Sequence, residues 1–144
     1  IRRAEDEYPH SGQIALPGGR IEPNETASDA AKREAEEEVG LDAAKTNILG
    51  NLTPITIPVS GFLVYPFISV INFEPVWKPN PTEVDVVIPV PLNDLHNQIN
   101  ERVEQRMFNH KPMQIKYFHL QGQKVWGATA MILNELKLVT SFLH

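Results

Sequence analysis

The chain has 144 residues, of which 42% are hydrophobic and 22% charged, and it contains no cysteine. This near-average globular composition excludes a disordered chain, disulfide bridges and thiolate metal sites, and a chain without cysteine fits the cytoplasm, a reducing compartment. The net charge of -5 argues against nucleic acid as a partner. No apolar run reaches the roughly 18 residues of a transmembrane helix, so we expect no membrane partner.

The first predicted elements are a strand and a helix. Residues 10–16 are typical of a short strand that runs into the chain-breaking Pro17-Gly18-Gly19. Residues 26–39 form the best helical pattern in the chain, with alanines on one side and Glu and Lys elsewhere. Gly40 follows directly, as a glycine commonly does just past a helix end.

Further along the chain, strands are expected before a second long helix. Two β-rich runs, residues 47–57 and 62–73, are separated by a proline- and glycine-containing turn and are expected to pair. The later segments are, in order, an apolar strand at 84–90, one helical turn at 92–95, an ambiguous polar stretch at 97–111, a strand at 115–120 and a helix at 129–143.

This order of elements indicates an α+β protein, or a mixed sheet between helices, in a single domain over residues 1–144. The first residue is Ile1 and not Met, so we also expect that a short N-terminal piece is missing.

Acidic residues gather on the first predicted helix. Glu34, Glu37 and Glu38 are three and four positions apart, so they share one helix face and repel one another by a few tenths of a kcal/mol per pair. A hard divalent cation such as Mg²⁺ would remove that repulsion. Gly18 and its neighbour Gly19 would let the backbone approach a ligand and offer carbonyls to a metal. The alternative is a solvated helix face.

Arg33 is placed to brace this region. It lies within reach of Glu37 on the next helical turn and could also bend back to Glu25 in the preceding loop. Such a contact between loop and helix would hold the carboxylates in place.

The spacing of these residues is Gly-x5-Glu-x7-Arg-Glu-U-x-Glu-Glu-x-Gly-U, where U is a bulky apolar residue. It departs only at Ala35 and is matched by Gly19, Glu25, Arg33, Glu34, Glu37, Glu38, Gly40 and Leu41. Seven fixed residues would match by chance at roughly 10⁻⁸ per starting position, which disfavours the solvated face. This pattern is the Nudix box, and the chain resembles the Nudix hydrolases.

The resemblance implies an α/β/α sandwich with a mixed sheet and the cleavage of a nucleoside diphosphate linked to another group. It implies that Glu34, Glu37 and Glu38, helped by the Gly18 carbonyl, ligate Mg²⁺ or Mn²⁺. Gly19, Glu25, Arg33 and Gly40 would support the box structurally.

Two carboxylates are candidates for the catalytic base. Glu37 could orient or deprotonate the attacking water. Glu83 is the second candidate, since family members often supply a glutamate from a late loop; an ordinary surface acid is an equal alternative.

Residues before the box resemble a branch of coenzyme A diphosphatases. Its signature, Leu-Leu-Thr-x-Arg-(Ser/Ala)-x3-Arg-x3-Gly-x3-Phe-Pro-Gly-Gly, is matched at Arg3, Ala4, Gly12, Pro17, Gly18 and Gly19. The chain departs from it at Ile1, Tyr8 and Leu16. Residues 80–84, 90–92 and 125–130 also look like that branch.

The branch implies the hydrolysis of coenzyme A or a derivative to 3′,5′-ADP and 4′-phosphopantetheine, with Arg3, Gly12 and Gln13 as substrate contacts. Two other readings stay open: an ADP-ribose or nucleotide-sugar pyrophosphatase, and a non-catalytic module that senses a nucleotide. The family is often dimeric, so a homodimer is an option too.

Overall fold

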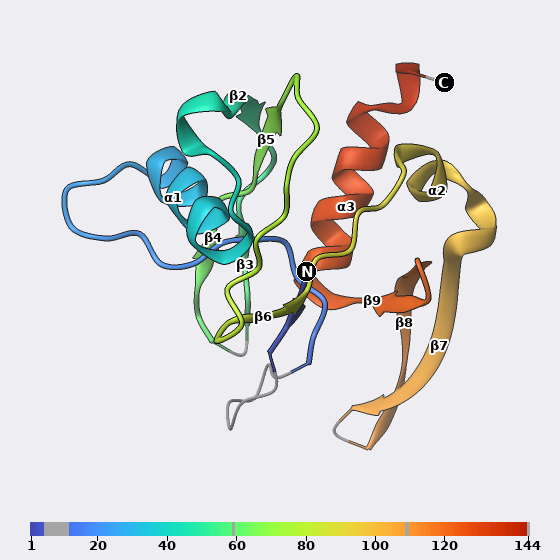
Figure 1. The fold of residues 1–144 in the computed structure, drawn as a ribbon. Helices are drawn as coiled ribbons and strands as arrows, with labels where there is room; N and C mark the ends of the chain where they lie inside the picture. Colours follow the sequence, from blue (N-terminus) through green and yellow to red (C-terminus); the bar gives the residue numbers. More distant parts are fainter. Residues whose placement is uncertain (5–11, 59, 109, 144) are drawn as a thin grey trace. The chain divides into compact units, whose positions relative to one another are not determined.

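The structure is a computed structural model, and it describes residues 1–4, 12–58, 60–108 and 110–143 (Figure 1). It consists of two compact units, Ile1–Ile88 and Pro89–His144. Each unit combines helical segments with antiparallel strands, which confirms the α+β class. In the described ranges, no helix has both the length and the apolar character that crossing a membrane requires.

The first unit carries one long helix and three short strand pairs. Its elements are β1 (Arg2–Arg3), α1 (Ala27–Val39), the 3-10 turn η1 (Ala43–Lys45), β2 (Asn47–Asn51), β3 (Ile55–Thr56), β4 (Leu63–Val64), β5 (Phe67–Val70) and β6 (Val84–Val86). The pairs are β1 with β6, β2 with β5 and β3 with β4. Its buried cluster contains Ile1, Val39 and Val84.

The second unit is built on a long hairpin. Its elements are α2 (Leu92–His96), η2 (Gln98–Asn100), β7 (Glu101–Phe108), β8 (Lys111–Leu120), β9 (Gln123–Val125), α3 (Gly127–Val139) and η3 (Ser141–Leu143). Strands β7, β8 and β9 form one antiparallel sheet in that order. The buried residues of the unit are Leu95, Phe118, Leu120, Val125, Ala130 and Ile132.

Helix α1 forms where the sequence predicts it. Thr26 caps its first turn by accepting a hydrogen bond from the Asp29 amide at 3.2 Å, and the Asp29 carboxylate accepts the Thr26 amide at 3.4 Å. This reciprocal capping box satisfies two amides that a helix start leaves without partners. Gly40 ends the helix in the left-handed conformation, with φ 74°.

The end of α1 is tied to the segment that leads into β6. The amides of Lys78 and Asn80 donate to the carbonyls of Val39 and Glu38, both at 2.9 Å. These bonds satisfy carbonyls that the helix end leaves free. They also fix a distant part of the chain beside the last turn of α1.

The strands agree only partly with the sequence-based expectation. The runs 47–57 and 62–73 do pair, but each is broken into two strands, at 52–54 and around Pro66. Residues 12–16 contain one isolated bridge, between Ile14 and Arg2, and no continuous strand. The prediction of a strand over residues 10–16 is therefore wrong for residues 12–16. Residues 10 and 11 lie outside the described residues.

The structure also defines the strand pairing and the polar segment 97–111, which the sequence left ambiguous. All strand pairs in the described ranges are antiparallel, so the parallel pairing of a mixed sheet does not occur among them. Strands such as β1 and β3 have two residues each, which is too short to join neighbouring pairs into one sheet. Residues 101–108 form β7 because β8 pairs with them along their whole length.

Replacing Gly40 with alanine should destabilise the protein by about 1–2 kcal/mol. The backbone there is left-handed, and a Cβ would lie 2.8 Å from the Lys78 Cβ. Urea denaturation of both proteins measures the loss.

Gly50→Ala is the matched control. Position 50 lies in β2, its φ is not in the left-handed region, and nothing lies within 4 Å of an added Cβ. This variant should stay within about 0.5 kcal/mol of the wild type. Equal stability of the two variants would contradict the role given to Gly40.

Candidate metal centre

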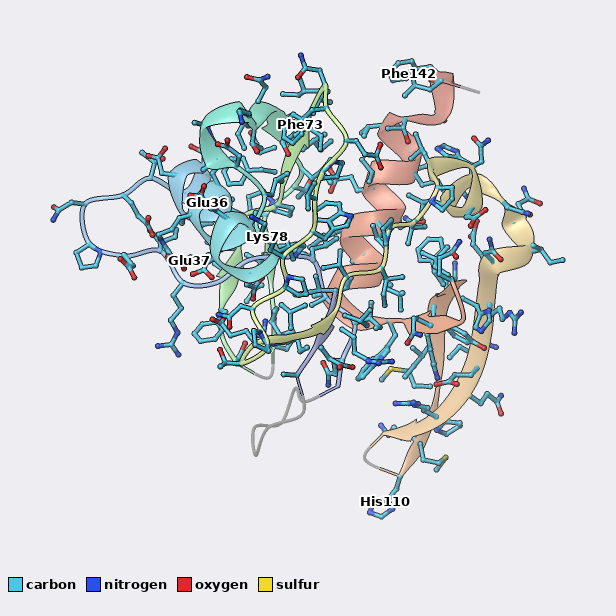
Figure 2. All side chains as sticks on the ribbon, viewed as in Figure 1. Glu36, Glu37, Phe73, Lys78, His110 and Phe142 are labelled. Carbon is cyan, nitrogen blue, oxygen red and sulfur yellow. The ribbon has the colours of Figure 1, made fainter. Side chains whose placement is uncertain are left out.

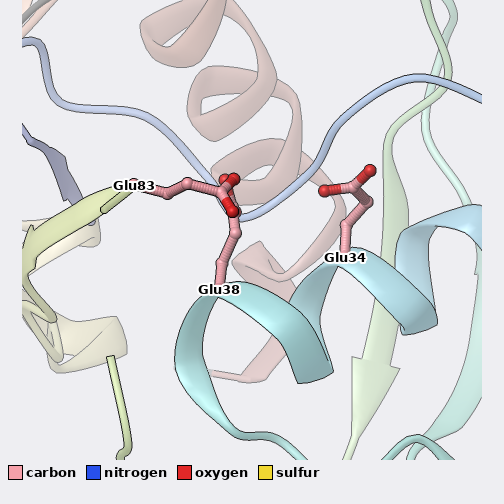
Figure 3. Close-up of side chains that lie close together, drawn as sticks. All are labelled: Glu34, Glu38 and Glu83. Carbon is pink, nitrogen blue, oxygen red and sulfur yellow. The ribbon is translucent and has the colours of Figure 1, made fainter. Parts of the chain in front are cut away.

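Three carboxylates meet at one face of α1. Glu34 and Glu38 stand on the helix, and Glu83 reaches them from the segment that precedes β6 (Figure 3). One oxygen of each lies within 4.8 Å of the others. Glu38 is 1% exposed and the Glu34 side chain 14% exposed, so the negative charges are largely removed from water. We call these three residues the carboxylate cluster.

The carboxyl of Glu38 lies in surroundings that oppose its negative charge. Burial is the main cause that raises the pKa of its carboxyl above the ordinary value, and the charges of Glu34 and Glu83 raise it further. The amide of Gly18, which donates to Glu38 Oε2 at 2.9 Å, and the charge of Arg3 act in the opposite direction. The net effect is that the carboxylate form is disfavoured.

One oxygen of this buried carboxylate lacks a hydrogen bond. Among the described residues, no donor reaches Glu38 Oε1 within hydrogen-bond distance, and the nearest cation, Arg3 Nη1, is 3.6 Å away. A buried acceptor without a donor is costly in free energy. A divalent cation would satisfy this oxygen and the two neighbouring carboxylates together, so the residues present fit such an ion.

The loop before α1 closes over the cluster through its two glycines. The Gly18 amide donates to the Glu38 carboxylate. Binding of a metal by the Gly18 carbonyl stays a prediction. Gly19 packs so closely on Glu34 that an added Cβ would overlap the carboxylate. A side chain at position 19 would therefore displace the Glu34 carboxylate.

Arg33 connects the loop to the helix. Its Nε and Nη2 donate to Glu25 at 3.1 and 2.8 Å, and Nη2 also donates to the Arg20 carbonyl at 3.0 Å. Its Nη1 donates to Glu34 and to Glu37, both at 2.9 Å. The hydrogen bond from Arg33 is the main cause that lowers the pKa of Glu25.

Glu37 lies outside the carboxylate cluster. Its side chain is 54% exposed and bonded to Arg33 (Figure 2). The sequence grouped it with Glu34 and Glu38 as a metal ligand and as a catalytic residue. In this arrangement Glu37 shares the Arg33 guanidinium with Glu34, and both roles stay predictions.

Sequence reasoning missed Asn80, which positions Glu83. The Asn80 amide nitrogen donates to Glu83 Oε1 at 3.0 Å, and its side-chain oxygen accepts from the Thr82 amide and hydroxyl at 3.2 and 2.8 Å. The backbone of Asn80 is fixed by Glu38, as described above. An Asn followed by proline is a turn signal, and that signal could have identified a rigid support for Glu83.

The expected substrate contacts lie on the strand side of the cluster. The Arg3 amide donates to the Gln13 carbonyl at 3.0 Å, and the Arg3 side chain faces Glu38. Gly12 forms a turn with φ 66°. Arg3 therefore lies beside the cluster and is bonded to Gln13, while Tyr8 lies outside the described residues.

Comparison with known proteins identifies the family. The NUDIX domain family matches residues 1–110. An uncharacterized Nudix hydrolase NudL of Pectobacterium atrosepticum is 34% identical over 97% of this chain and 73% of its own. NudL of Photorhabdus laumondii is 33% identical over 94% and 72%. Nudix hydrolase 15, mitochondrial, of Arabidopsis thaliana is 36% identical over 91% of this chain, which spans about half (48%) of that relative.

The chain belongs to the Nudix hydrolase family. It is therefore an enzyme of a family that hydrolyses small molecules in which a nucleoside diphosphate is linked to another group. Enzymes of this family generally use divalent metal ions. The carboxylate cluster is compatible with such an ion.

Gly19→Ala should lower the affinity for Mn²⁺ by about tenfold or more, as loss of a supporting contact around a metal commonly does. The added methyl group must push the Glu34 carboxylate out of the cluster. Calorimetric titration with Mn²⁺ measures the change, with Gly50→Ala as control. Unchanged Mn²⁺ affinity in Gly19→Ala would show that the Glu34 carboxylate does not hold the ion.

The metal-free protein should lose stability as pH rises through the raised pKa of Glu38. A carboxyl whose pKa is raised by folding contributes most below the ordinary glutamate pKa of about 4.3, and that contribution disappears when it ionises in the folded state. Glu38→Gln should remove this decline and leave metal-free protein more stable than wild type at pH 7. Melting temperatures in EDTA across pH 4–8 test it.

Glu36→Gln is the control for that experiment, because Glu36 stands on the same helix but is exposed (Figure 2). It should follow the wild-type profile. A Glu38→Gln profile parallel to the wild type would mean that ionisation of Glu38 does not oppose folding.

Proposed function

We propose that this enzyme hydrolyses coenzyme A or a derivative to 3′,5′-ADP and 4′-phosphopantetheine, with Mg²⁺ or Mn²⁺ as cofactor. The carboxylate cluster is the observation that carries the metal-dependent hydrolysis. The choice of coenzyme A is supported by the branch signature at Arg3, Ala4, Gly12 and residues 17–19.

Glu34 and Glu38 are the residues that would hold the cation. Mg²⁺ in phosphoryl-transfer sites is commonly held by one or two carboxylates together with phosphates of the substrate. Glu37 and the Gly18 carbonyl are further ligands that the family resemblance implies. A bound divalent ion neutralises diphosphate charge and acts as a Lewis acid on a phosphoryl oxygen.

Glu83 is the better of the two candidate bases. The Asn80 amide fixes its Oε1, and the carboxylate already lies at the cluster where the substrate phosphates would sit. Glu37 is bonded to Arg33 and is not among the three carboxylates that lie together. We therefore assign Glu83 to orient the attacking water and accept its proton, which leaves Glu37 as the alternative.

The two arginines of the site, Arg33 and Arg3, support the loop over the cluster and offer a positive charge to the substrate. Arg33 is engaged by Glu25, Glu34 and Glu37 and so stiffens the loop over the cluster. Arg3 offers a cation beside Glu38 that a substrate phosphate could share. Attack in line with the leaving phosphate needs this fixed geometry more than it needs covalent chemistry from the protein.

The experiment is a substrate panel with and without Mg²⁺: coenzyme A, ADP-ribose, diadenosine polyphosphates and nucleotide sugars, with products separated by chromatography. Metal-dependent release of 3′,5′-ADP from coenzyme A is expected, and Glu38→Gln should lower kcat by about 100-fold or more. The exposed Glu36→Gln should keep wild-type turnover.

Other results would redirect the assignment. Preferential cleavage of ADP-ribose or a nucleotide sugar would retain the metal centre and overturn the substrate. Ligand binding without turnover of any member would favour a nucleotide-sensing module.

A further inference from the structure

Arg20, the residue after Gly19, carries a guanidinium group that lies over an aromatic ring. Its Cζ lies 5.1 Å from the centre of the Phe62 ring, which is the distance of a cation–π contact. No carboxylate in the described part of the chain forms an ion pair with it. Phe62 is 49% exposed, so both groups face solvent.

The backbone of Arg20 is anchored beside the carboxylate cluster. Arg33 Nη2 donates to the Arg20 carbonyl at 3.0 Å, and Nη1 of the same guanidinium donates to Glu34 at 2.9 Å. One planar group therefore joins Arg20 to the cluster. The guanidinium at the other end of Arg20 lies over the Phe62 ring. Phe62 is itself positioned by the β3–β4 turn, in which the Ile57 amide donates to the Phe62 carbonyl at 2.8 Å.

The other arginines of the first unit are already engaged. Arg2 pairs with Asp85, Arg3 faces Glu38, and Arg33 bonds to three carboxylates. In the described part of this unit, Arg20 is therefore the arginine whose side-chain donors are not used by a carboxylate. Stacking on Phe62 covers a face of the guanidinium and leaves its N–H edge available.

We propose that Arg20, held over Phe62, is a binding subsite for a phosphate monoester of the substrate, separate from the diphosphate that is cleaved. The proposal rests on the proposed function, because coenzyme A carries such a group at the 3′ position. A phosphate monoester near pH 7 has a charge close to −2 and accepts two parallel hydrogen bonds from a guanidinium edge. The diphosphate itself belongs at the carboxylate cluster, where a divalent ion would neutralise it.

The test compares two ligands that cannot be cleaved, adenosine 3′,5′-bisphosphate and adenosine 5′-monophosphate, by calorimetry in the presence of Mg²⁺. The wild type should bind the bisphosphate at least tenfold more tightly. Arg20→Gln should remove that preference and leave binding of the monophosphate unchanged. Phe62→Leu, which removes the ring but keeps an apolar side chain, should reduce the preference in the same direction.

Lys45→Gln is the matched control, because it removes one positive charge from an exposed residue of the same unit whose partner is Asp42. It should retain the preference. The proposal is overturned if the wild type binds both ligands equally, if Arg20→Gln keeps the preference, or if it weakens both ligands equally. The last result would place Arg20 on the phosphate that the two ligands share.

Hydrolysis of coenzyme A and dephospho-coenzyme A separates this proposal from the proposed function. If the wild type cleaves neither while the bisphosphate preference and its loss in Arg20→Gln are observed, the substrate is wrong and the subsite stands. If both are cleaved, Arg20→Gln should raise KM at least tenfold for coenzyme A alone. An equal change for both substrates would overturn the subsite.

Discussion

Glu38 is a carboxylate with 1% exposure that has two other carboxylates beside it, and its surroundings serve to hold it there. The Gly18 amide satisfies one oxygen, and Arg3 lowers the electrostatic cost without forming a hydrogen bond. The remaining oxygen has no donor among the described residues. Such an arrangement opposes folding in the absence of a counter-charge and creates a strong attraction for a divalent cation.

The geometry of the centre depends on three segments that are distant in sequence. Helix α1 supplies Glu34 and Glu38, the glycine loop packs onto both, and the segment before β6 supplies Glu83. Backbone hydrogen bonds join the helix end to that last segment, and Arg33 joins the helix to the loop. These bonds, together with the buried cluster that holds Val39 and Val84, the residues after Glu38 and Glu83, therefore bring the carboxylates together.

The sequence predicts α1 and its contacts because they are local. The helix over residues 26–39, its end at Gly40 and the reach of Arg33 to Glu25 follow from spacing along one helix and loop. Glu37 is bonded to Arg33 four residues earlier on the same helix, a contact that helical spacing does predict. The membership of Glu83 depends on the long-range backbone bonds from Lys78 and Asn80 to the end of α1, which no periodicity encodes. Strand β7 was missed for the same reason, since its polar sequence becomes a strand only by pairing with β8.

The most direct test of the central claim is a crystal structure with Mn²⁺, located by its anomalous scattering. The account predicts a peak bound by carboxylate oxygens of Glu34 and Glu38, on the side of the cluster where Glu83 lies. An ion found instead between exposed Glu36 and Glu37, or no ion at a concentration that supports hydrolysis, would contradict it.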